Sequence, residues 1–202
     1  MSSAIAPLVG ALPPADASCL VLAQGMGLEQ LSQVLEQELP GTVAVVVLPR
    51  AVEPGSAGLK ALQNAAERID IAVLLDARLG DGELASSMSD AEGVLCWARQ
   101  VKSLRAQLGK EATIVADAGI SRHDAMVGAE AGASAIWFNQ REEQQAAELY
   151  PEDDEGPQSV ADLYMWWEQI MEIPAVLDLG SLDQPPSWLD QAEFVAVQIT
   201  PA

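Results

Sequence analysis

The sequence predicts an α/β protein that folds as a small (β/α)8 barrel, also called a TIM barrel, with residues 1–202 forming one domain. Eight apolar runs of strand length occur along the chain, and seven segments of helical character lie between them. The runs are continuous instead of alternating, which is typical of parallel strands buried on both faces. Strict alternation of strand and helix favours a closed barrel, because each helix then covers the two strands it connects.

The expected strands are, in chain order, 19–24, 42–48, 71–76, 93–97, 113–117, 134–139, 175–179 and 194–199. The expected helices are 28–39, 56–69, 81–89, 98–109, 121–132, 159–172 and 183–191. An open doubly wound sheet is the alternative. The glycine-rich phosphate loops that are typical of that fold do not occur, and the glycines of 23–27 suggest one only weakly.

Two features depart from a regular barrel. Residues 140–158 form a long acidic segment, which we expect to be a solvent-exposed loop after the sixth strand. The chain ends just after the eighth strand, so the eighth helix is expected to be missing. Either the apolar N-terminal segment, 1–17, or a second copy in a homo-oligomer could cover the open side of the barrel.

The net charge excludes several classes of partner. It is −20, from 30 acidic and 10 basic residues, and the first 49 and last 61 residues contain no base. Such a chain repels nucleic acid and anionic lipid, so we expect neither as a partner. The longest apolar run, "VAVVVL", is far below the roughly 18 residues of a membrane helix. A solvated acidic surface is the simplest interpretation, and a cation-rich partner is the alternative.

The two cysteines point to the cytoplasm. Cys19 and Cys96 each lie in an apolar, strand-like run, which indicates buried free thiols in a reducing compartment rather than a disulfide. The N-terminus lacks the basic region of a signal peptide. We therefore expect a cytoplasmic protein.

The stretch "GISRHDAMVGAEAGASAIWFN" (119–139) resembles the unit from the fifth to the sixth strand of the thiamine phosphate synthase and TenI family. "EIPAVLDLGSL" (172–182) and "QAEFVAVQIT" (191–200) are similar to its seventh and eighth strands. "WWEQIMEIP" (166–174) is similar to a divergent proteobacterial branch of that family. The likeness is strong in the second half of the chain and faint in the first.

The resemblance implies a transferase of thiamine biosynthesis. In that family, hydroxymethylpyrimidine diphosphate loses pyrophosphate with the help of Mg²⁺, and the nitrogen of a thiazole phosphate attacks the resulting cation. The implied cofactor is Mg²⁺, and the implied ligand is a small phosphorylated molecule. The reaction needs acids for the metal, basic groups for the pyrophosphate, and backbone N–H groups for the thiazole phosphate.

The resemblance implies catalytic roles for Arg50, Asp76 and Arg78, and makes Asp76 the implied metal ligand, with Asp81 nearby. It also implies that substrate or phosphate is bound by residues at or after the ends of the fifth, seventh and eighth strands: Ser121, His123, Gly180, Ser181 and Gln198.

Each part of that site departs from the family pattern. The family's Asn-Asp-Arg after strand three is Asp76, Ala77 and Arg78 here, and no lysine follows Arg50. The Gly-Gly after strand seven is Gly180 and Ser181. No helix follows Gln198, which removes the N–H donors and the partial positive charge of a helix N-terminus.

Structural roles compete with these functional ones. Ser121 is also the expected N-cap of the fifth helix, with Asp124 favourable beside it, and His123 could face solvent or the loop. Arg50, Asp76 and Arg78 could form a surface salt-bridge cluster. The aromatic and sulfur side chains have expected packing roles: Trp166, Trp167 and Met171 in the core, Trp188 on a loop, and Trp97 filling space near the site.

Two hypotheses follow. The protein is either a thiamine phosphate synthase-type enzyme with degraded catalytic and phosphate sites, or a non-catalytic member that binds a ligand or another protein. The loss of the family's motifs after strands two, seven and eight favours an inactive protein.

Overall fold

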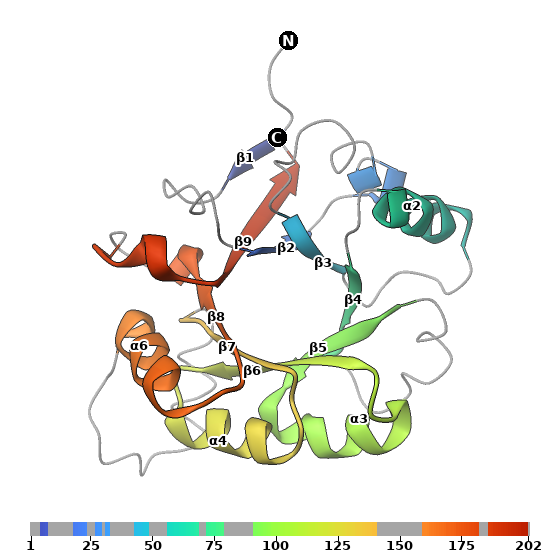
Figure 1. Cartoon of the computed structure of the whole chain (residues 1–202). Helices are drawn as coiled ribbons and strands as arrows, with labels where there is room; N and C mark the ends of the chain where they lie inside the picture. The colour runs from blue at the N-terminus through green and yellow to red at the C-terminus, as the bar shows by residue number, and fades with distance from the viewer. Residues whose placement is uncertain are drawn as a thin grey trace.

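Eight parallel strands pair in a closed ring, seen along its axis in Figure 1. The structure is a computed structural model, and it describes residues 5–7, 18–23, 27–29, 31–32, 43–48, 56–68, 72–78, 91–140, 159–181 and 186–201. The strands of the ring are β2 (Ser18–Ala23), β3 (Val43–Leu48), β4 (Ala72–Asp76), β5 (Gly93–Trp97), β6 (Thr113–Gly119), β7 (Ala135–Phe138), β8 (Ala175–Asp178) and β9 (Phe194–Pro201). Because β9 pairs with both β8 and β2, the sheet closes, and the barrel prediction is confirmed.

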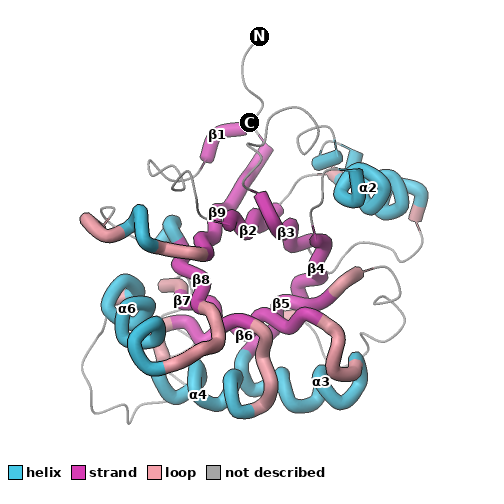
Figure 2. Tube along the Cα trace, viewed as in Figure 1, coloured by secondary structure: helices cyan, strands magenta, loops and turns pink. Residues whose placement is uncertain are grey.

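The helices lie outside this ring (Figure 2). They are α2 (Ala57–Arg68), α3 (Val101–Leu108), α4 (Arg122–Glu130) and α6 (Val160–Ile170), with the 3₁₀ turn η2 (Ala98–Gln100) leading into α3. Each agrees with an expected helix to within two or three residues. Leu28, Glu29, Leu31 and Ser32 are also helical, inside the expected helix 28–39. The helix expected over 81–89 lies outside the described residues, as does the expected acidic loop 140–158 except for Gln140.

The last expected helix, 183–191, is wrong in its described part. Residues 186–191 form a turn and the short 3₁₀ helix η4 (Leu189–Gln191). The hydrogen bonds from Leu189 N–H to Pro186 O and from Ala192 N–H to Leu189 O span three residues. Two adjacent prolines precede this turn, and a proline has no N–H with which to continue an α-helix.

One strand was not expected. β1 (Ile5–Pro7) pairs antiparallel with Ile199–Pro201, the end of β9 that continues beyond its pairing with β8. These three residues are the only described part of the expected N-terminal covering segment, and Figure 1 shows them outside the ring beside β9.

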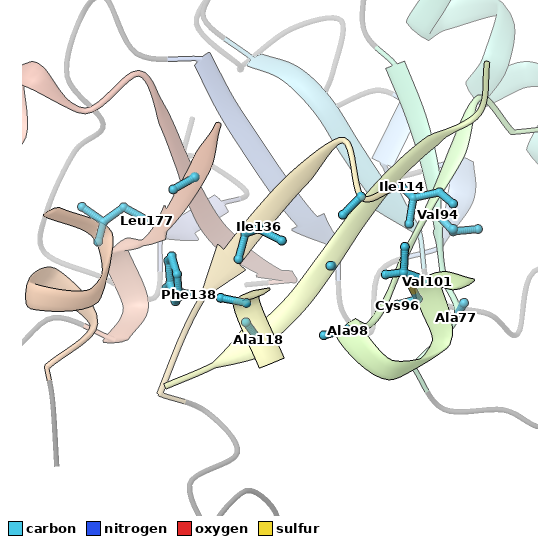
Figure 3. Packing of buried hydrophobic residues seen from close by; sticks show 14 of the residues in the cluster. Ala77, Val94, Cys96, Ala98, Val101, Ile114, Ala118, Ile136, Phe138 and Leu177 are labelled. Atoms are coloured by element: carbon cyan, nitrogen blue, oxygen red, sulfur yellow. The ribbon is translucent and has the colours of Figure 1, made fainter. Parts of the chain in front are cut away.

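Apolar side chains fill both sides of the barrel wall. Inside, alternate strand residues make a cluster of Leu74, Leu95, Val115, Trp137, Val176 and Ala196. Outside, the intervening residues pack against the helices; Figure 3 shows Val94, Cys96 and Ile114 near Val101. In β4 to β8, whose side chains are described, both faces of the strand are buried, and this explains their continuous apolar runs.

The tryptophans of α6 belong to the outer core, as expected. Trp167 is fully buried, its ring lies 6.0 Å from that of Phe138, and its Nε1–H donates to Ile173 O at 2.7 Å. Trp166 and Met171 are partly buried against the same cluster. Trp188, in the turn before η4, stacks on Tyr164 of α6 with ring centroids 5.5 Å apart, which confirms its expected packing role.

Candidate functional site

Polar side chains follow the inner apolar layer at the carboxyl ends of the strands. Two residues beyond Leu74, Leu95, Val115, Trp137 and Val176 come the residues that form the mouth of the barrel: Asp76, Trp97, Asp117, Asn139 and Asp178. Alternate strand residues point to the same face, so these side chains continue the interior of the barrel at its mouth. This is the end at which TIM barrels carry their active sites.

Arg78 ties two carboxylates of this layer together. Its Nε and Nη2 donate to the two oxygens of Asp76, at 3.0 and 2.7 Å, and its Nη1 donates to Asp117 Oδ2 at 2.8 Å. The backbone N–H of Arg78 also donates to Asp76 Oδ1, at 3.1 Å. The guanidinium therefore holds Asp76 through both carboxylate oxygens and reaches across β5 to Asp117 on β6.

Two tryptophans complete the surroundings of the guanidinium. The Arg78 Cζ atom lies 4.9 Å from the centroid of the Trp137 ring and 5.7 Å from that of Trp97. Trp97 Nε1–H donates to the backbone oxygen of Arg78 at 2.9 Å. A cation over an aromatic face is attracted by the ring quadrupole, so Arg78 is fixed by its backbone, by its two carboxylates and by these rings.

Asp117 is the most enclosed member of the group. Its Oδ1 accepts hydrogen bonds from Asn139 Nδ2 at 2.7 Å and from Gly119 N–H at 2.9 Å. Gly119 has a φ of 55°, a left-handed conformation that favours glycine, and it gives the tight turn that brings its N–H to this oxygen. Burial raises the pKa of Asp117, and the Arg78 guanidinium, the Asn139 amide and the Gly119 N–H only partly offset this rise.

Arg78 keeps its charge in this setting. Burial lowers the pKa of its guanidinium, but the hydrogen bonds and negative charges of Asp76 and Asp117 raise it further than burial lowers it. Only 10% of the Arg78 side chain and 15% of the Asp76 side chain are exposed, and Asp117 is fully enclosed. Bulk water is thus largely excluded from the ion pairs.

A third carboxylate lies at the end of β8. Asp178 is fully buried, and its Oδ1 accepts from Gly180 N–H at 2.8 Å. Among the described side chains of the mouth there are thus three aspartates and one arginine.

The structure brings some of the expected site residues together and separates others. Asp76 and Arg78 meet, and Trp97 lies beside them, as expected. Ser121 caps α4, its Oγ accepting from Asp124 N–H at 3.1 Å, while His123 is exposed on the same helix. Gly180 is in η3 (Leu179–Ser181), and for Ser181 and Gln198 only the backbone, in η3 and β9, is described.

Arg50 and Asp81 lie outside the described residues. Sequence reasoning missed Asp117, Asn139 and Asp178. A signal for them existed, because each is the polar residue that comes at or near the end of an expected strand, in "TIVAD", "AIWFN" and "AVLDL".

The described residues do not fit the implied Mg²⁺. Arg78 occupies both oxygens of Asp76, the implied ligand, and within the described ranges no group of three His, Cys, Asp or Glu side chains could hold a metal ion. No reaction step through a metal can therefore be derived from this arrangement.

A lysine Schiff base at the mouth does not fit either. The sequence has three lysines, Lys60, Lys102 and Lys110, and all three are described and exposed. The first two are on the outer helices α2 and α3, and the third follows α3. A carbonyl substrate inside the barrel would have no amine with which to form a covalent intermediate.

A cavity of about 420 Å³ lies away from this mouth. Its lining comes mainly from α2 and the start of β4 and β5, and includes Lys60, Asn64, Glu67, Val73 and Glu92. The cavity lies at the amino ends of β4 and β5, whereas TIM barrels carry their active sites at the carboxyl ends, so the mouth is the better candidate site.

Comparisons with known proteins support the fold. The chain matches no family model, and no curated protein matches it significantly in sequence. Among solved structures it is similar to a truncated 3-deoxy-D-arabino-heptulosonate 7-phosphate synthase from Thermotoga maritima, with a TM-score of 0.60, 15% identity, and coverage of 96% of this chain and 79% of that one.

Two aldolases are similar as well. The HpcH/HpaI aldolase from Desulfitobacterium hafniense DCB-2 has a TM-score of 0.59 and 10% identity, over 92% of this chain and 87% of that one. The 2-keto-3-deoxy-6-phosphogluconate aldolase of Zymomonas mobilis ZM4 has a TM-score of 0.56 and 14% identity, over 90% and 80%. At these identities the likeness shows the TIM-barrel fold alone. None of the described helices is long and apolar enough to cross a membrane.

Proposed function

We propose that this protein is a divergent, non-catalytic relative of the thiamine phosphate synthase and TenI family that binds a thiamine-related phosphate without forming it. The sequence motifs of residues 119–139 and 166–182 support the family, and the structure supports its barrel. The alternative from the same family is a non-catalytic member that binds another protein.

The observation that carries the proposal is that Arg78 is hydrogen-bonded to both Asp76 and Asp117. Condensation needs a free acid for the metal and a free base for the departing pyrophosphate. Here the acid and the base neutralise each other at 2.7–3.0 Å, in a place from which water is largely excluded. A substrate would have to break these bonds before either group could act, and that costs several kcal/mol for a buried pair.

The similar solved structures suggest aldol chemistry as the competing function. The exposed positions of all three lysines argue against an aldolase that works through a Schiff base. The hydrogen bonds of Arg78 to Asp76 and Asp117 argue against an aldolase that works through a metal ion held by these carboxylates.

A turnover assay tests the proposal directly. The purified protein is incubated with hydroxymethylpyrimidine diphosphate, thiazole phosphate and Mg²⁺, and thiamine phosphate is measured. We expect no product above the uncatalysed background. Sustained turnover that is lost in Asp76→Asn but retained in Asp190→Asn, an exposed aspartate on η4, would overturn the proposal.

A melting assay with thiamine phosphate tests the binding part. A rise in Tm without turnover supports ligand binding. No rise at saturating ligand favours the protein-binding alternative, for which size-exclusion chromatography with light scattering gives the oligomeric state. A cytoplasmic location and a homo-oligomer that covers the barrel side remain parts of the proposal.

A further inference from the structure

Asp76 and Asp117 face one cation from two sides. They belong to β4 and β6, with β5 between these strands, and the nearest oxygens lie 2.7 and 2.8 Å from two different nitrogens of the same guanidinium. Carboxylate pairs that converge from the ends of nearby strands are the kind of arrangement that holds a hard divalent ion together with several waters.

The cation here is part of the chain and is held in place at three points. The Arg78 N–H donates to Asp76, its carbonyl oxygen accepts from Trp97 Nε1–H, and its guanidinium lies over the Trp137 ring. Such a site is built around the side chain, in contrast to an exposed ion pair, whose members are free to rotate away.

Both carboxylate oxygens of Asp117 already have hydrogen-bond donors. With Arg78, Asn139 and Gly119 as donors, the buried carboxylate has a hydrogen bond to each oxygen and a neutralising charge beside it. A water-coordinated ion could enter only by displacing the guanidinium. If the guanidinium stayed, two cations would share one pair of carboxylates and repel each other.

We propose that the Arg78 guanidinium is a resident cation that takes the place of a divalent metal ion between Asp76 and Asp117, so that the barrel mouth is complete without metal. This inference goes beyond the proposed function because it concerns the cation and not the ligand of the barrel. Its test uses no thiamine compound, so it can fail or hold independently of the turnover and binding assays.

Removal of the guanidinium should turn the pair of carboxylates into a metal site. We compare the Tm of the wild type and Arg78→Ala in EDTA and in millimolar MgCl₂ or MnCl₂. The wild type should change by less than about 1 °C. The variant should have a lowered Tm in EDTA and recover about 5–10 °C when the metal reaches about 100 times its Kd. Electron paramagnetic resonance should show Mn²⁺ bound to the variant and free with the wild type.

Three further variants make the result specific. Arg78→Lys keeps a cation and should not respond to metal. Arg78→Ala combined with Asp76→Asn should lose the response that Arg78→Ala gains. Arg105→Ala removes an arginine that makes five hydrogen bonds to backbone oxygens and, among the described residues, no ion pair with a carboxylate. This variant should be destabilised without any gain from metal.

Two results would overturn the inference. One is a wild type whose Tm rises with Mg²⁺ or Mn²⁺ and loses that rise in Asp76→Asn, because metal and guanidinium would then coexist. The other is an Arg78→Ala variant that stays indifferent to metal, or stays unfolded both with and without it, because a divalent ion would then be unable to replace the guanidinium.

Discussion

Arg78 and Arg105 lie at opposite ends of the barrel, and each makes at least four hydrogen bonds, but their partners differ in kind. Arg78, at the carboxyl ends of the strands, binds the side chains of Asp76 and Asp117. Arg105, on α3, donates to the backbone oxygens of residues that lead into β6 and β7: Gly109, Lys110, Ala112 and Gly132.

This difference in partners indicates that Arg105 has a structural role, whereas Arg78 belongs to the candidate site. Backbone carbonyls do not titrate, and Arg105 simply fixes two loops at the amino ends of neighbouring strands. Arg78 instead gathers ionisable groups in a buried place, where each charge depends on the others. The amino end of a TIM barrel serves stability and its carboxyl end carries chemistry, and the two arginines follow that division.

The largest effect is expected for Arg78→Ala measured in chelator. Removal of one partner leaves Asp76 and the buried Asp117 without their cation, so the free energy of unfolding should fall by about 3–5 kcal/mol. Urea titration followed by circular dichroism measures the change. A loss below about 1 kcal/mol would mean that the pair behaves like an exposed salt bridge, and the contrast with Arg105 would disappear.

Arg105→Ala should have a smaller effect, about 1–2 kcal/mol, because solvent can take over part of its hydrogen bonding. The same urea titration applies. Arg105→Lys should recover little of the loss, since an ammonium cannot span several carbonyls as the planar guanidinium does. Full recovery by lysine would show that charge alone matters at this end of the barrel.

Ser121→Ala should cost about 1 kcal/mol, through the loss of the N-cap of α4. Ser121→Asn can cap the helix and should retain most of the stability. The two variants also test whether Ser121 contributes to ligand binding at the barrel mouth. If thiamine phosphate binds, equal affinity in the wild type and both variants would limit Ser121 to its structural role, whereas weaker binding by Ser121→Asn at unchanged stability would make it a ligand residue.

The smallest effect on stability at neutral pH is expected from Cys96, on the outer face of β5. Burial, followed by the charges of Asp117 and Asp76, raises the pKa of its thiol to about 12. At pH 9 the thiolate fraction is then about 10⁻³, so iodoacetamide should alkylate Cys96 in the native protein at least 100-fold more slowly than in the denatured chain. Peptide mass spectrometry separates Cys96 from Cys19.

The sign of the linked stability follows from that pKa. The folded protein holds the Cys96 proton more tightly than the unfolded chain, so the contribution of this group is full below about pH 8.5 and is lost as the pH rises toward 12. Cys96→Ala should therefore lose less stability than the wild type between pH 8.5 and 10. An identical alkaline decline in both proteins would contradict the raised pKa.

Much of the fold could be predicted because its signals are local. The continuous apolar runs placed all eight strands of the ring, and Ser121 was identified as the cap of α4 from the residue types around it. The helix expected over 183–191 does not form, because two adjacent prolines precede Ser187–Gln191 and interrupt the helical hydrogen bonds. β1 is too short to give a periodic signal.

Local patterns in the sequence are enough to predict the (β/α)8 architecture and to place Asp76 and Arg78 at a strand end. What these two side chains do depends on long-range contacts, because Asp117 is 39 residues from Arg78 and Asn139 is 22 residues from Asp117. A periodic pattern reports which face of a strand is apolar. It does not report the order and register of strands around a ring, and these place the Asp117 carboxylate within 2.8 Å of the guanidinium.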